Sequence, residues 1–427
     1  LIAYRASIDV SVGRLRQAID EVAPYLEGSS PRPLVAAAIV AVPALFCDGY
    51  TTMARELAGR ARQMHATIWK RGLFYQPPEI HLYNLALTLI EEGRIAEAHA
   101  LASERFERCD EAGRLRGAAW YRVVLGRACL AQGRVATAAA HLRVADELMR
   151  ALGYDAHRRM TLGHLVTALA LAGDLAGARD AQAVCDEVSP LLRIYDPFVV
   201  EGRAWLAAAE AGSGTHEPSS TVAPTTLPPS VRVASPPTCY TPWPGSASRP
   251  ATLGRLHDLA STREAPPIAA RLAHVRPLAA GDAEALEAAT DGFERTGALL
   301  VAAEACADAS RAWRRAGHAR RGTAAANRAH LLADRCDGAR TPALAALDAA
   351  TPLTEREREI ALLAARGGTS RAIADQLYLS ERTVENHLQR IYTKLGARGR
   401  SELHALLGVG AAQARDRGAG GDAERDA

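Results

Sequence analysis

The sequence predicts an all-α protein in which a solenoid of helical hairpins precedes a C-terminal module of four short helices. Hydrophobic residues make up 48% of the 427 residues but aromatic residues only 5%, a composition typical of alanine- and leucine-rich helices packed through small side chains. A glycine-centred motif recurs at a fixed spacing, and helix caps alternate with apolar stripes near the end of the chain. These three observations favour helix over strand throughout.

A 40-residue period runs through residues 1–212. The stretch GRIAEA begins at Gly93, GRVATA at Gly133 and GDLAGA at Gly173. We expect an amphipathic helix before each glycine and another after it. Less regular copies are expected to turn at Gly49, Gly281 and Gly317. Because one hairpin cannot bury its apolar face alone, the hairpins must stack, and in this they resemble tetratricopeptide-type repeats.

The period breaks after residue 212. Pro, Ser and Thr dominate residues 213–252, and proline removes a helix donor, so this stretch is expected to be an irregular linker. A helical pattern returns over residues 253–345 as further repeats. Two origins stay open for residues 213–250: a natural insertion, or the product of compensating frame changes in the gene.

The concave face of such a solenoid offers a surface for a signal. The repeats therefore predict sensing of a small-molecule or protein inducer, with a passive structural arm as the alternative. We favour packing roles over a ligand cage for four tryptophans: Trp69, Trp120, Trp205 and Trp313.

Residues 351–407 carry the signals of four short helices. Thr354 and Glu357 form a capping box at the start of the first helix, Ser380 caps the third, and Gly396 ends it. The remaining boundary signals are Gly367 and Gly368 after the first helix, Thr369 or Ser370 before the second, and Gly399 before the fourth. The residues expected to pack between the helices are Ile360, Leu363, Ala364, Ile373, Ala374, Leu377, Val384, Leu388, Ile391 and Leu395.

The stretches LTEREREI, SERTVENH and KLG resemble the LuxR-type helix-turn-helix. The resemblance implies that the third helix enters the major groove of DNA. It assigns backbone-positioning roles to Arg382, Thr383, His387 and Lys394, and base-edge contacts to Glu385, Asn386 and Gln389, with Arg390 at the edge of the same face.

Glu385 stands where many members of that family carry lysine. A carboxylate can accept a hydrogen bond from cytosine N4 but cannot bind guanine O6 or N7. This departure keeps open an alternative reading, a helical-repeat protein-interaction scaffold with a degenerate DNA-binding module. From residue 380 to 400 there are five Arg or Lys residues against two Glu, so we expect few phosphate contacts and a modest salt dependence.

Helical repeats followed by this module resemble the C-terminal part of the large ATP-binding (MalT-like) regulators of the LuxR family. The resemblance implies a transcription regulator on double-stranded promoter DNA, with RNA polymerase as a further partner. It also implies a homodimer through the fourth helix, around Leu403, Leu406 and Leu407. The chain has no G-x-x-x-x-G-K-[ST] motif, so no cofactor is expected in it, and ATP would enter only through a domain upstream of Leu1. Because Leu1 is not methionine, we expect such an upstream segment.

Other classes of protein are not favoured. Seven cysteines occur without CxxC or Cys/His spacing, which predicts reduced thiols and no metal site. No apolar run approaches the length of a membrane span, so we expect a cytoplasmic protein without a membrane partner. His157, His164 and Asp155 lie within repeats and lack a nucleophile motif, so we expect no enzyme. Residues 408–427 are expected to form a disordered tail.

Overall fold

The computed structural model describes residues 2–72, 77–189, 191–212, 266–350 and 354–395, with scattered positions at 254–261 and 397–403. Within these ranges the chain forms helices and turns and no strand, so the all-α prediction is confirmed. The predicted linker at 213–252, the start of the pattern that follows it, and the tail at 408–427 lie outside the described residues.

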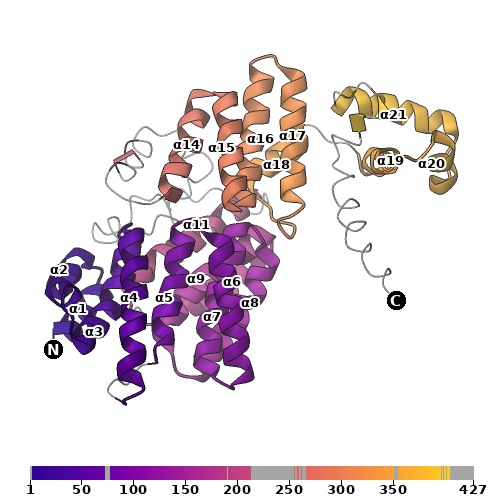
Figure 1. The fold of residues 1–427 in the computed structure, drawn as a ribbon. Helices are drawn as coiled ribbons and strands as arrows, with labels where there is room; N and C mark the ends of the chain where they lie inside the picture. Colours follow the sequence, from indigo (N-terminus) through magenta and orange to yellow (C-terminus); the bar gives the residue numbers. More distant parts are fainter. Residues whose placement is uncertain are drawn as a thin grey trace, which may run out of the picture.

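The first block of repeats is a row of antiparallel hairpins (Figure 1). Its elements are α1 (Ile2–Ser11), α2 (Leu15–Leu26), α3 (Pro31–Cys47), α4 (Thr51–Trp69), α5 (Glu79–Glu91), α6 (Ile95–Glu111), α7 (Leu115–Gln132), α8 (Val135–Ala151), α9 (Asp155–Ala172), α10 (Leu175–Glu187), the 3₁₀ helix η1 (Arg193–Tyr195) and α11 (Asp196–Gly212). Each α-helix contacts the next along the chain, and α7 also contacts both α5 and α9. Successive hairpins are therefore stacked, as the repeats predict.

Glycine makes the turns within the hairpins. Gly93, Gly133 and Gly173 have φ values of 78°, 85° and 81°, in the left-handed region that glycine enters without steric cost. The predicted turns at these residues are confirmed, and helices are likewise joined at Gly49, Gly281 and Gly317. The hairpin of α1 and α2, which turns at Gly13, was not predicted from the sequence.

A second block packs against the first. It contains α14 (Pro266–Ala280), α15 (Ala283–Thr296), α16 (Leu299–Arg315), α17 (Ala319–Ala333) and α18 (Pro342–Ala350). Asp337 accepts hydrogen bonds from the backbone N (3.1 Å) and Oγ1 (2.7 Å) of Thr137, near the N-terminus of α8. The backbone N of Arg340 donates to the carbonyl of Leu171 (2.6 Å). Val135 and Leu171 of the first block also belong to the apolar core of the second, so the two blocks share an interior.

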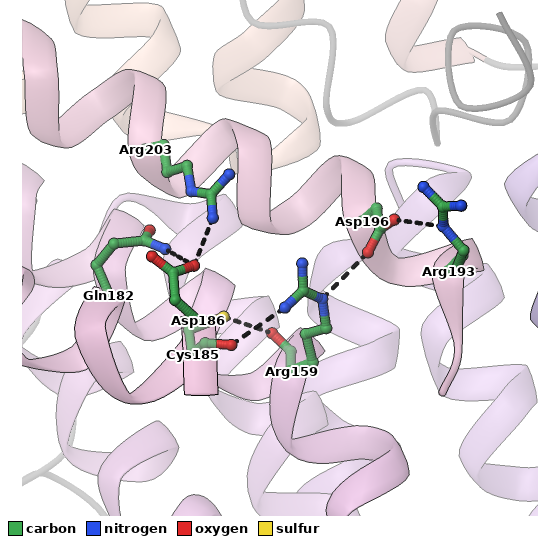
Figure 2. A network of polar contacts seen from close by, with 7 residues as sticks. All are labelled: Arg159, Gln182, Cys185, Asp186, Arg193, Asp196 and Arg203. Atoms are coloured by element: carbon green, nitrogen blue, oxygen red, sulfur yellow. Dashed lines mark hydrogen bonds and ion pairs between the residues drawn. The ribbon is translucent and has the colours of Figure 1, made fainter. Parts of the chain in front are cut away.

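A polar network fastens the last helices of the first block (Figure 2). Arg159 of α9 donates through Nε to Asp196 (3.1 Å) and through Nη1 to the carbonyl of Cys185 (3.1 Å). The second contact satisfies one of the carbonyls that the C-terminal turn of α10 leaves open. Asp186 at the end of α10 pairs with Arg203 of α11. Side chains of α9 and α11 thus bind the C-terminal turn of α10.

The C-terminal module contains α19 (Glu355–Ala365), α20 (Ser370–Leu377) and α21 (Glu381–Leu395). The predicted inward residues are confirmed, with Leu363 only partly buried. The core is built from Ile360, Ala361, Ala364, Ala365, Ile373, Ala374, Leu377, Val384, Leu388, Ile391, Leu395 and Leu403. Arg400, Glu402 and Leu403 are helical, at the position predicted for a fourth helix.

In the part of the chain that the structure describes, no helix is long and apolar enough to cross a bilayer. The same residues contain no group of His, Cys, Asp or Glu side chains arranged to hold a metal ion. Six cysteines fall within these ranges, and each is buried and free: Cys47, Cys109, Cys129, Cys185, Cys306 and Cys336.

Candidate nucleic-acid interface

Caps fix the start of each helix of the module. In the predicted capping box, the backbone N of Glu357 donates to Thr354 Oγ1 (3.2 Å), and the backbone N of Thr354 donates to the Glu357 carboxylate (2.8 Å). Thr369, and not Ser370, caps α20, because its Oγ1 accepts from the backbone N of Ala372 (3.1 Å). Each such cap stabilises its helix by about 1 kcal/mol.

The turn between α20 and α21 sets the direction of α21. Tyr378 ends α20 in the left-handed conformation, with φ 54° and ψ 45°. Ser380 then caps α21, since its Oγ accepts from the backbone N of Thr383 (3.1 Å). Arg356 of α19 donates to the carbonyl of Leu377, which ties the end of α20 to the first helix. The start of α21 is therefore held from both neighbouring helices.

Five of the predicted DNA-binding residues lie on one exposed face of α21. Arg382, Glu385, Asn386, Gln389 and Arg390 are all exposed. They occupy positions i, i+3, i+4, i+7 and i+8, which fall on one side of an α-helix. The opposite side of α21 packs into the module core. The face that would meet a DNA groove is thus solvent-exposed and backed by a packed interior.

The three other predicted site residues are placed differently. Thr383 is half-buried, and its Oγ1 lies 2.7 Å from Ser380 Oγ, so the hydroxyl already takes part in the helix cap. His387 is half-buried, and its Nδ1 is buried without a hydrogen-bond partner in the described structure. Lys394 belongs to α21, but its side chain lies outside the described residues. The phosphate-contact roles of these three residues stay predictions.

The predicted dimer contact needs one correction. Leu403 has no exposed surface and belongs to the module core. It faces inward because the start of the fourth helix covers the core formed by α19–α21, where Arg400 Nη2 also donates to Ser370 Oγ (2.9 Å). A side chain without exposed surface cannot form a dimer contact, so that part of the prediction is wrong. Leu406 and Leu407 lie outside the described residues.

Tyr378 is a surface residue that the sequence did not single out beyond its place in the turn. Its side chain is 96% exposed, and it directly precedes the start of α21. A left-handed conformation is unusual for a residue that is not glycine. The available signal was an aromatic residue at a turn position where glycine would fit more easily.

Comparisons with known proteins match the module. Residues 351–407 match the family GerE, "Bacterial regulatory proteins, luxR family". The spore germination protein GerE of Bacillus subtilis (strain 168) is 46% identical over 50 residues, which are 12% of this chain and 68% of GerE. The uncharacterized transcriptional regulatory protein YvfU of the same organism is 51% identical over 55 residues, 13% of this chain and 28% of YvfU. The DNA-binding transcriptional activator DevR/DosR of Mycobacterium tuberculosis is 38% identical over 55 residues, 13% of this chain and 25% of that protein. The chain therefore spans about a quarter of the length of YvfU and DevR/DosR.

One solved structure resembles most of the chain at low similarity. It is the crystal structure of a Rap protein complexed with competence and sporulation factor, with 12% sequence identity and a TM-score of 0.42. The match covers 78% of this chain and 84% of that one. Both similarity values are too low to support an inference about ligands or partners of the repeats.

Proposed function

The chain belongs to the luxR family of bacterial regulatory proteins, and we propose that it regulates transcription by placing α21 in the major groove of promoter DNA. The exposed face of α21 carries this proposal. In a helix-turn-helix, the N-terminal residues of the second helix of the motif contact base edges. Glu385, Asn386 and Gln389 supply hydrogen-bonding groups there, and Arg382 and Arg390 flank them with positive charge.

The chemistry of this face favours particular bases. Asn386 and Gln389 each present an amide that can bind adenine at N6 and N7. Glu385 can accept a hydrogen bond from cytosine N4, but its carboxylate has nothing to donate to guanine. We therefore expect a half-site that combines adenine and cytosine on the strand contacted by α21. This preference differs from that of relatives with lysine at this position.

The repeats act as the signal-receiving part in this proposal. α17 and α21 contact each other, which supports a role of the repeats in limiting how α21 approaches DNA. In the absence of signal, they hold the module away from DNA or keep it monomeric. A single module makes a small interface, so binding as a homodimer on paired half-sites is expected, with Leu406 and Leu407 as the remaining predicted contacts. RNA polymerase is a further expected partner, and ATP would act only through an upstream domain.

Titration of the full chain onto a DNA library tests the proposal. Asn386→Ala is expected to lose about 1–3 kcal/mol on the preferred sequence and to change base preference there. Arg382→Ala is expected to weaken binding to all sequences together and to reduce the salt slope. Gln376→Ala, which removes an exposed amide from α20, is the matched control and should bind as the wild type. Equal losses on preferred and random DNA for Asn386→Ala would show that α21 is not the base-reading helix.

The second candidate is a protein-interaction scaffold whose module has lost DNA binding. Glu385 favours it, because a carboxylate on the groove face repels phosphate. The same titration separates the two functions. Salt-sensitive, sequence-dependent binding supports the regulator, whereas no binding at low salt supports the scaffold.

A further inference from the structure

A cavity of about 190 Å³ lies where the two blocks of repeats meet. Residues of α5, α6, α7, α9 and α11 line it from the first block, and residues of α14, α15 and α16 line it from the second. Figure 1 shows these elements facing one another where the blocks join. Its apolar walls are formed by Leu130, Leu171, Trp205, Phe293, Leu300 and Val301. Such walls favour an occupant with a mainly apolar surface.

Two polar side chains also line this cavity. Arg127 and His164 are 3% and 4% exposed, and Arg127 Nη1 and His164 Nε2 are buried without a hydrogen-bond partner. The rest of the Arg127 guanidinium is committed: Nη2 pairs with the buried Glu91, and the group lies 4.7 Å from the ring centroid of Phe198. The His164 ring lies against the same Phe198, at 4.4 Å between centroids. The arrangement fixes Arg127 in place and leaves one of its donors unused.

The charges around the cavity argue against an ionised ligand. The lining includes the carboxyl groups of Glu92, Glu201 and Glu304 beside the guanidinium groups of Arg127 and Arg271. Because positive charge is not in excess, an anion gains no net attraction. A cation is not favoured either, because Glu92 already pairs with Arg55 and Arg94, and burial raises the pKa of Glu304. The unused group in the cavity, Arg127 Nη1, can only donate and carries positive charge. Burial lowers the pKa of His164 well below its ordinary value, so the ring is neutral near pH 7.

We propose that this cavity binds an uncharged, largely apolar small molecule with one carbonyl or hydroxyl oxygen, which accepts a hydrogen bond from Arg127 Nη1 beside His164. A cavity of comparable size holds a benzene-sized molecule, so the ligand has on the order of ten non-hydrogen atoms. Binding in this cavity is independent of the proposed regulatory function. Only the role of the bound molecule as the signal rests on that function. Because both blocks supply the walls, an occupant contacts both at once and stabilises their association.

A matched series of probes tests the ligand class on the full wild-type chain. Acetophenone has an apolar body and one carbonyl, ethylbenzene has nearly the same shape without the oxygen, and benzoate carries a charge on the same ring. Binding is measured by saturation-transfer NMR and titration calorimetry. Acetophenone is expected to bind at least about tenfold more tightly than either analogue. Ethylbenzene lacks the acceptor for Arg127 Nη1, and the charge of benzoate meets the carboxyl groups that line the cavity. Equal affinities, or tighter binding of benzoate, would overturn the proposal.

A pair of alanine variants tests the location. Ala131 lines the cavity and Ala136 is exposed on α8. Ala131→Phe should fill the space and abolish acetophenone binding, whereas Ala136→Phe should bind it as the wild type does. Undiminished binding in a folded Ala131→Phe protein would place the probe elsewhere and contradict the proposal. Should that variant not fold, the probe series on the wild type still decides. None of these readouts involves DNA, so a failed DNA titration would overturn the proposed function without touching this result.

Discussion

The C-terminal module and the repeats differ in the burial of their polar side chains. In the module, Glu357 of the capping box is the one buried charged side chain among the described residues, and the polar face of α21 is exposed: Arg382, Glu385, Asn386, Gln389 and Arg390. In the first block, Arg127 and Glu91 form an ion pair in the interior, and His65 Nδ1 lies 3.0 Å from His81 Nε2 in a fully buried pair. The polar face of α21 is accessible to a large partner, as the proposed DNA binding requires. The repeats enclose their polar groups, as the proposed binding of a small ligand requires.

This difference changes what a substitution does. An exposed polar residue of α21 can be replaced with little effect on folding, because water solvates whatever remains. Replacing a buried polar residue of the repeats removes the group that offsets the lost solvation of its partner. Substitutions of buried polar residues should therefore lower the stability of the repeats, whereas substitutions of the exposed polar residues of α21 should change only binding.

The largest expected effect is at Arg127. Arg127→Met removes the guanidinium that pairs with the buried Glu91, which should lower the free energy of unfolding by about 3–5 kcal/mol. Arg382→Met on α21 is the matched control and should change it by less than about 0.5 kcal/mol. Urea denaturation of the full chain, followed by far-UV circular dichroism, measures both. Adding Glu91→Leu to Arg127→Met should recover most of the lost stability. If Arg127→Met alone were as stable as the wild type, the contrast between the repeats and the module would be wrong.

Leu388 tests the apolar side of the same contrast. Leu388→Ala removes a core side chain of α21 and should destabilise the module by about 2–5 kcal/mol through the cavity it leaves. The neighbouring Gln389→Ala, at an exposed position, should not. Hydrogen exchange measured by mass spectrometry should show faster exchange in α19, α20 and α21 and unchanged exchange in the first block. Faster exchange in all regions would mean that module and repeats unfold together.

Acid should destabilise the repeats before the module. Burial lowers the pKa of His157 to about 4, and burial together with the nearby His65 lowers the pKa of His81 to about 3. Between these values and the ordinary pKa of about 6.5, the unfolded chain binds protons that the folded chain does not. The contribution of these histidines to the free energy of unfolding is intact above about pH 6.5. It falls as the pH drops, and at pH 5 each of the two residues has lost about 2 kcal/mol.

Thermal unfolding at pH 7.5 and pH 5.0 measures this loss. His157→Gln, which cannot be protonated, should show a smaller drop between the two pH values than the wild type. An unchanged drop would mean that other groups cause the acid sensitivity.

The smallest expected effect is at the contact between the two blocks. Asp337→Ala removes the acceptor for the backbone N and Oγ1 of Thr137 near the N-terminus of α8 and should cost about 1 kcal/mol, as for the loss of a helix cap. Asp334→Ala is the control, since Asp334 is exposed at the end of α17. Chemical denaturation of both variants makes the comparison. Equal stability of the two variants would show that the contact of Asp337 with Thr137 does not stabilise the protein.

The parts of this fold that were predicted from the sequence depend on residues close together in the chain. The capping box of Thr354 and Glu357 spans one helical turn, and the apolar stripe of α21 recurs every three or four residues. Glycine turns at a 40-residue spacing gave the hairpins in the same way. Each of these signals is local, because caps, turns and helix periodicity act within a few residues.

The contacts that the sequence did not predict join distant residues. Arg127 and Glu91 are 36 positions apart, and Thr137 and Asp337 are 200 apart. The interpretation of the tryptophans as packing residues fits Trp120 and Trp313, which are buried, but Trp205 lines the cavity and Trp69 is 41% exposed. No period reveals such placements, because they depend on how the blocks stack. The DNA-binding roles on α21 come from family resemblance and remain predictions.

The contact between Thr137 and Asp337 also bears on the order in which the protein is made. The ribosome releases α8 long before it synthesises Asp337, so the emerging first block must wait 200 residues for a group that completes one of its helices. A chain that terminates before residue 300 leaves α8 without this acceptor and leaves Gly133 without its neighbours Leu300 and Cys336. The contacts of the first block are therefore complete only when translation has nearly reached the C-terminal module.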